Sequence, residues 1–207
     1  MIQKVAIYLS VFALAFLILF ISVLRTAAVK YDFASRTSQN TSNISADNAI
    51  DYQLPYAGKI LPDSSLWPLK ALRDKIWLAV TTNPSRKAEL KLLFADKRLV
   101  SSKMLFDKGK PEIAFSVLTK AEKYLEEANI QAGVNEKNGS DTIDFITRLA
   151  NASLKHYQVM EGLLEGAPED AKPKIIEAQS YAKKVYEETR NKLNEKGVSP
   201  PENPYKW

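Results

Sequence analysis

The chain has no cysteine, one histidine, and only 7 glycines and 10 prolines among its 207 residues. The lack of cysteine excludes disulfides, thiolate metal ligands, a cysteine nucleophile and a lipoprotein-type lipidated cysteine. With a single histidine, a transition-metal site is also disfavoured, and we predict no cofactor. Few helix-breaking residues and a high content of Leu, Ala, Lys and Glu favour long helices over short strands.

One hydrophobic segment, Val5 to Leu24, contains no charge, no proline and no glycine. Twenty helical residues span about 30 Å, which matches the hydrocarbon core of a bilayer. A cleaved signal peptide is the alternative, but its apolar stretch is normally shorter and ends in a small-residue cleavage pattern. We therefore predict a membrane anchor over residues 1–30 with a single transmembrane helix, in contact with the lipid bilayer.

The orientation of this anchor is less strongly indicated by sequence. Lys4 precedes the segment, whereas Arg25, Lys30 and Arg36 follow it, which leans towards a cytoplasmic C-terminal side. Long domains translocate largely regardless of flanking charge. Together with the family resemblance described below, this leads us to expect a single-pass membrane protein with an extracytoplasmic C-terminal domain.

Two segments are too polar or too rich in proline to form a core. Residues 31–50 are rich in Ser, Thr and Asn, which predicts a flexible linker. Residues 198–207 form a Pro-rich tail, for which we expect an extended, mobile end or a strap on the folded domain.

Residues 51–197 are predicted to form an all-α domain, an up-and-down bundle of four to five helices. After an extended stretch over residues 54–62, capping residues and prolines place the helix starts. The predicted helices run from a cap at Asp63, Ser64 or Ser65 to Val80, from Pro84 to Lys108, from Pro111 to about Gly133, from a cap at Ser140 to about Leu164, and from about Pro173 to Lys196.

Apolar residues recur at helical spacing in these helices. One stripe comprises Ala88, Leu92, Ala95, Leu99 and Phe106, and the next comprises Ala114, Leu118, Ala121, Leu125 and Ala128. The very short connection at Gly109 predicts that these two helices form an antiparallel hairpin. Leu66, Leu69, Leu72 and Ile76 are expected to pack the first helix on this hairpin, with Trp67 and Trp77 as its large core residues.

The run LPDSSLWPLKALRD at residues 61–74, followed by Asn83-Pro84 and by AEL and ADKRL at residues 88–90 and 95–99, resembles an uncharacterised bacterial domain-of-unknown-function family. The resemblance covers about residues 52–132. Members of that family are often found behind one membrane-spanning segment, and some are attached to anti-sigma-factor-like membrane proteins. The resemblance implies an anchored helical domain and supplies no activity.

Charge is concentrated in one part of the chain. Between Leu66 and Lys110, eleven lysines and arginines stand against four acids, a formal charge of +7 in a chain whose total is +5. Such a region attracts anionic polymers or lipid headgroups, although a merely solvated helix face is the commoner reason for surface charge. The possible partner-binding residues are Trp67, Lys70, Arg73, Trp77, Arg86, Lys87, Lys91, Lys97 and Arg98.

No catalytic residues are predicted, because no serine, threonine or carboxylate lies in an activating context and His156 is expected to be a surface or packing residue. We expect a non-catalytic interaction or structural module of the cell envelope, with an anionic envelope polymer or another envelope protein as its partner. Nucleic acid is disfavoured because stacking aromatics and a known motif are missing. The alternatives are a regulatory scaffold with a cytoplasmic helical domain and an enzyme with a cryptic carboxylate site.

Overall fold

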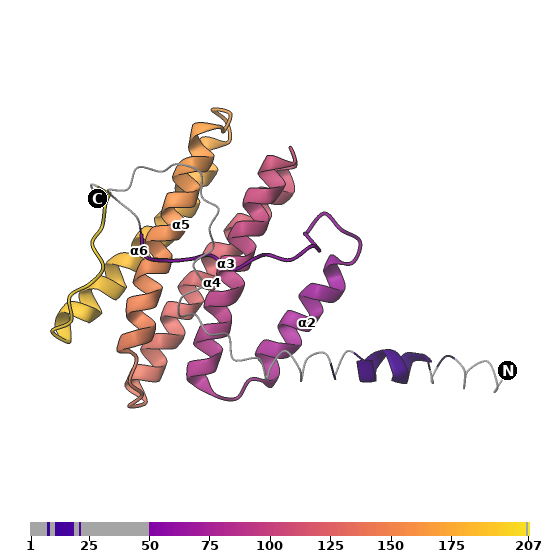
Figure 1. The fold of residues 1–207 in the computed structure, drawn as a ribbon, viewed down its shortest axis with the longest axis horizontal. Helices are drawn as coiled ribbons and strands as arrows, with labels where there is room; N and C mark the ends of the chain where they lie inside the picture. Colours follow the sequence, from indigo (N-terminus) through magenta and orange to yellow (C-terminus); the bar gives the residue numbers. More distant parts are fainter. Residues whose placement is uncertain (1–7, 9–10, 19–20, 22–49, 206) are drawn as a thin grey trace.

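The computed structural model describes Tyr8, residues 11–18, Ile21, residues 50–205 and Trp207. Over these residues the structure is helical and contains no strand. The five main helices are α2 (Trp67–Val80), α3 (Pro84–Asp107), α4 (Pro111–Lys137), α5 (Ile143–Glu165) and α6 (Lys172–Glu195). Helices α3 to α6 form an antiparallel bundle, and α2 stands beside α3 at one edge of it (Figure 1). The all-α prediction is therefore confirmed.

The predicted transmembrane segment lies largely outside the described residues. Within Val5 to Leu24 the structure describes only Tyr8, residues 11–18 and Ile21, which are helical and exposed. Among the described residues, no helix combines the length and hydropathy that a bilayer crossing needs. The predicted linker at residues 31–50 also lies outside them, except for Ile50.

Two helix starts differ in their caps from the sequence prediction. Asn83 caps α3 as expected, since its side-chain oxygen accepts a hydrogen bond of 2.9 Å from the backbone N–H of Arg86. Helix α2 begins later than predicted and has no side-chain cap at Leu66, and the Asp63 carboxylate binds Lys110 Nζ at 2.7 Å. Ser140 does not cap α5 either, and the Asp141 carboxylate accepts a bond from the N–H of Ile143.

Helices α3 and α4 each end just before a glycine that adopts a left-handed backbone. Gly109 (φ 68°) ends α3, and the N–H of Lys110 returns to the carbonyl of Leu105 at 2.9 Å, the bond that closes a Schellman motif. Helix α4 continues past Gly133, where the prediction stopped it, and ends before Gly139 (φ 80°). A glycine inside a helix costs only about 1 kcal/mol, which the packing of this long helix offsets.

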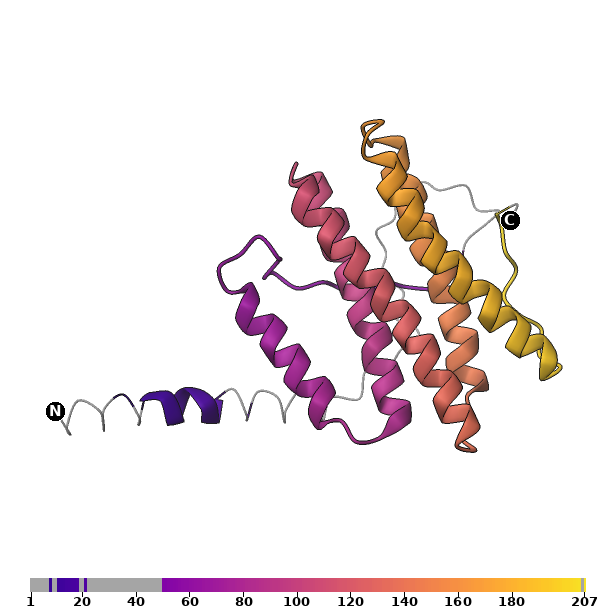
Figure 2. The ribbon, with the colours of Figure 1, turned by 180° about the vertical axis from the view of Figure 1, so that it is seen from behind.

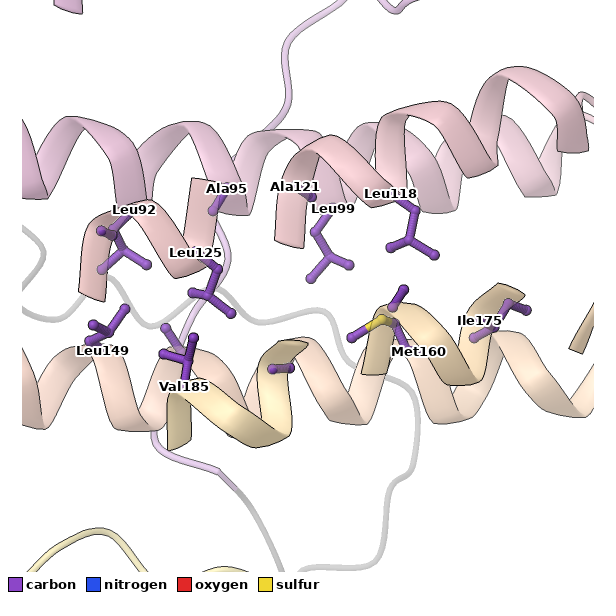
Figure 3. Close-up of a cluster of buried hydrophobic side chains, with 14 residues drawn as sticks. Leu92, Ala95, Leu99, Leu118, Ala121, Leu125, Leu149, Met160, Ile175 and Val185 are labelled. Atoms are coloured by element: carbon purple, nitrogen blue, oxygen red, sulfur yellow. The ribbon is translucent and has the colours of Figure 1, made fainter. Parts of the chain in front are cut away.

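The core lies where the α3–α4 hairpin faces the α5–α6 hairpin. Figure 3 shows Leu92, Leu99, Leu118 and Leu125 pointing from the first hairpin towards side chains of the second, among them Met160. The alanine stripe of α4 is fully buried, which permits the close packing against α3 that its sequence predicted. Of the two predicted stripes, only Phe106 is not fully buried.

Two extended segments, residues 50–62 and the C-terminal tail, are straps on this bundle. Residues 50–62 cross it as an extended segment, with Ala57 and Leu61 buried, before the chain turns into α2 (Figures 1 and 2). The C-terminal tail packs back on α5 and α6, where Tyr205 and Trp207 contact Tyr157 at ring-centroid distances of 4.6 and 5.0 Å. The strap interpretation of the tail is therefore the one that the structure supports.

The predicted packing of α2 is wrong for most of its apolar residues. Trp77 is buried and meets Phe94 of α3 edge to face at 5.9 Å, but Trp67 is only half-buried. Leu66, Leu69 and Leu72 are 52%, 58% and 48% exposed. Helical spacing indicated an apolar face correctly, but it did not indicate what would cover that face.

Candidate functional site

A basic groove lies between α2 and the strap segment that precedes it. Its volume is about 530 Å³, and its apolar walls include Tyr56, Ile60, Leu66 and Leu69. Among the described residues, its charged lining consists of four cations, Lys59 of the strap, Lys70 and Arg73 of α2 and Lys97 of α3, and contains no carboxylate. The groove therefore combines apolar surface with positive charge, which suits an anionic group that carries an apolar part.

Two of the four cations already have partners within the domain. Lys70 Nζ donates to the carbonyl oxygens of Ala57 and Ile60 at 2.8 and 2.9 Å, which ties the strap to α2. Its ammonium also lies 5.0 Å from the ring centroid of Trp67, a cation–π contact. Arg73 binds the Asp74 carboxylate at 2.8 Å, and Asp74 is 5% exposed.

The cations of the groove are crowded around a single buried acid. Burial lowers the pKa of Lys70, and the neighbouring charges of Lys97 and Arg73 lower it further, while Asp74 opposes the effect. Burial likewise lowers the pKa of Lys97. Burial and mutual repulsion destabilise the charged forms of these lysines. An anion bound in the groove would stabilise those charged forms, so the groove favours negative charge.

The structure brings only part of the predicted partner-binding set together. Lys70, Arg73 and Lys97 line the groove, and Trp67 borders it through Lys70. Trp77 and Arg98 are 1% and 7% exposed, so their side chains belong to the interior and we remove them from the predicted surface.

The remaining predicted cations are not part of the groove lining. Arg86 pairs with Glu89 at 3.2 Å and Lys91 pairs with Glu127 at 3.4 Å. Lys87 lies on α3 and is not among the lining residues. The +7 region is therefore not one continuous positive face. Acids neutralise part of it. The cations that lie close together are those that line the groove.

A second polar feature, a buried charge network, lies inside the bundle. His156 of α5 is fully buried between Asp96 of α3, at 3.0 Å from Nε2, and Glu122 of α4, at 2.8 Å from Nδ1. The hydroxyl of Tyr52, in the strap, donates to the other Asp96 oxygen at 2.6 Å. The network thus joins three helices and the strap through charge-assisted hydrogen bonds.

The histidine of this network is held in its charged form. Burial by itself lowers the pKa of His156, but the charge of Glu122 and the hydrogen bonds to Asp96 and Glu122 raise it to about 9. Burial, followed by the charge of Asp96, raises the pKa of Tyr52 well above its usual value, so its hydroxyl remains a donor. The second oxygen of Glu122 is buried without a hydrogen-bond partner.

The three residues of the network are closed off from solvent and from the two cavities described. Asp96, Glu122 and His156 are each 0% exposed, and none of them lines the basic groove or the larger cavity of about 800 Å³ at the α3–α4 and α5–α6 turns. Among the described residues, no group of three or more His, Cys, Asp or Glu is placed to hold a metal ion.

Sequence analysis missed this network, although a signal was present. Asp96 falls in the apolar stripe with Leu92, Ala95 and Leu99, and Glu122 adjoins Ala121 in the stripe of α4. An acid at a core position requires a partner, because an unpaired buried charge is very costly. His156 of α5, the single histidine of the chain, is the partner of both acids.

Residues 59–196 match a family described as a domain of unknown function, DUF5667. The match covers two thirds of the chain, and the chain belongs to this family. It extends through α6, well beyond residue 132, where the sequence resemblance ended. Neither the comparison with curated proteins nor the comparison with solved structures found a match.

Proposed function

We propose that the chain is a membrane-anchored, non-catalytic interaction module of the cell envelope that binds an anionic partner through its basic groove. The observation that carries this proposal is the lining of the groove, in which four cations and several apolar side chains converge without a carboxylate. The uncharged run from Val5 to Leu24 supports the anchor. An extracytoplasmic bundle is part of the proposal.

A non-catalytic role is supported by the arrangement of the buried charge network. Two carboxylates do converge there, as a cryptic hydrolase would require, but both are fully buried on one histidine and line neither cavity. A substrate would have to open the bundle to reach them. The network is better suited to fixing the register of α3, α4 and α5 than to acid–base chemistry on a substrate.

Binding of a polyanion tests the proposal. Fluorescently labelled polyphosphate serves as the probe, and its anisotropy is measured with the full chain in mild detergent at low ionic strength. We expect Lys59→Gln/Lys97→Gln to weaken binding about tenfold. Lys120→Gln/Lys123→Gln removes the same charge from exposed positions on α4 and is the matched control.

The outcomes are distinct. Loss of binding in the groove variant alone supports the proposal. Equal losses in both variants would mean that only net charge attracts the polymer, and the groove would not be the binding site.

The alternative is a membrane-tethered regulatory scaffold with its bundle in the cytoplasm. The Lys and Arg residues that follow the apolar run favour it. Orientation separates the two functions, because the same groove would then meet cytoplasmic partners.

A further inference from the structure

Four large apolar side chains at the start and along the length of α2 are open to solvent. Leu66, Leu69, Leu72 and Val80 are 52%, 58%, 48% and 52% exposed, and we call these four residues the leucine face. The buried residues of the helix are Asp74 and Trp77. A face of this extent on one helix is uncommon on a soluble surface and indicates an interaction site.

Positive charge flanks the leucine face. The basic groove lies along one side, with Lys59 and Arg73 at its edge, and the exposed Lys75 lies on the other side. The only acid of α2, Asp74, is 5% exposed. Apolar side chains between flanking cations are the pattern of helices that lie in the interface of an anionic membrane.

A second copy of the chain fits this face less well. Two leucine faces that met around a two-fold axis would bring the flanking lysines and arginines of both copies together without a facing acid. Helix α2 also stands at the edge of the bundle, away from α5 and α6, so a flat surface can approach it without meeting the other hairpin (Figure 1).

We propose that α2 lies on an anionic lipid bilayer, with the leucine face inserted among the acyl chains and the groove cations at the headgroups. This inference rests on the proposed function and names the partner of its groove. If residues 5–24 span the bilayer, the 25 residues from 25 to 49 reach at most roughly 85 Å, which allows α2 to meet the same membrane. The link to a membrane anchor would then hold the leucine face close to the bilayer, at a high effective concentration of lipid.

The absence of cysteine makes a direct test possible. A polarity-sensitive fluorophore is attached to Leu69→Cys in the full chain, and in a separate control to Ile130→Cys, which replaces a residue on α4 that is 60% exposed. Both proteins are reconstituted in vesicles of phosphatidylcholine alone or mixed with phosphatidylglycerol, with a spin-labelled lipid as quencher. We expect quenching and a blue shift at position 69 in the mixed vesicles, and neither at position 130.

Charge variants show whether the headgroups are responsible. Each flanking cation contributes about fivefold to adsorption on an anionic surface, so Lys59→Gln/Lys75→Gln should lower the bound-to-free ratio of α2 about twenty-five-fold. Lys120→Gln/Lys123→Gln should leave the ratio unchanged. Circular dichroism confirms that each variant keeps its helices.

The remaining outcomes overturn one claim at a time. A blue shift at position 69 that grows with protein density and appears equally without phosphatidylglycerol would assign the face to a second copy. An unquenched fluorophore in an anchored chain that still binds polyphosphate would refute this inference and leave the proposed function intact. Quenching in a chain that alkaline carbonate releases from the vesicles would refute the anchor and leave this inference standing.

Discussion

Replacing His156 with leucine tests the buried charge network most severely. In the part of the chain that the structure describes, the imidazolium bonds both Asp96 and Glu122, and all three side chains are fully buried. Its removal leaves two buried carboxylates without the imidazolium that bonds them both, and Glu122 already has one oxygen without a hydrogen-bond partner. Breaking a buried ion pair costs about 3–5 kcal/mol, so we expect His156→Leu to lower the free energy of unfolding by at least that amount.

Urea unfolding of the full chain in mild detergent, followed by circular dichroism, measures this loss. With a slope of about 2 kcal/mol per molar urea, the midpoint should fall by about 1.5–2.5 M. The triple variant Asp96→Leu/Glu122→Leu/His156→Leu removes the charges together and should recover most of the loss. A midpoint for His156→Leu within about 0.5 M of the unmodified chain would show that the carboxylates do not depend on the imidazolium, and would refute the reasoning.

Three further predictions concern the same scaffold. Because the pKa of His156 is about 9 in the folded chain and its ordinary value is 6.5, the stabilisation is complete below about pH 6.5 and is lost as the pH rises through 9. The free energy of unfolding should therefore fall by about 1.4 kcal/mol per pH unit between those values, and urea midpoints from pH 6.5 to 9.5 should show a slope that His156→Leu lacks. Tyr52→Phe removes a charge-assisted hydrogen bond to Asp96 and should cost about 1.5–3 kcal/mol in the same assay, whereas an unchanged midpoint would mean that the strap does not support the network. Asn83→Ala removes the cap of α3 and should cost about 1 kcal/mol, while Asn83→Asp, which retains a capping oxygen, should remain close to the unmodified chain.

The bundle could be predicted from sequence because its signals are local. Asn83-Pro84 and Gly109 mark the ends of α3, and the alanine stripe of α4 is buried as its spacing indicates. The errors arose where a side chain found a distant partner. Asp63, one of the predicted caps of α2, instead binds Lys110, 47 residues away.

The candidate site could be predicted only in part for the same reason. The basic composition around α2 was visible, and Lys70, Arg73 and Lys97 do meet in one groove. No local pattern shows that Trp77 would be the one fully buried apolar residue of α2 or that Leu69 would be left exposed, because both depend on how α2 packs on α3. Pairings across 34 and 60 residues, such as those of His156, are fixed by the fold and not by spacing.

The orientation of the bundle is the most direct test of a membrane-anchored envelope module. A tag is added after Trp207, and protease is applied to cells whose outer barriers are opened while the inner membrane stays intact. We predict that the tag is cleaved in these cells, as it is after lysis. Protection of the tag until lysis would place the bundle in the cytoplasm, contradict the envelope function and favour the regulatory scaffold.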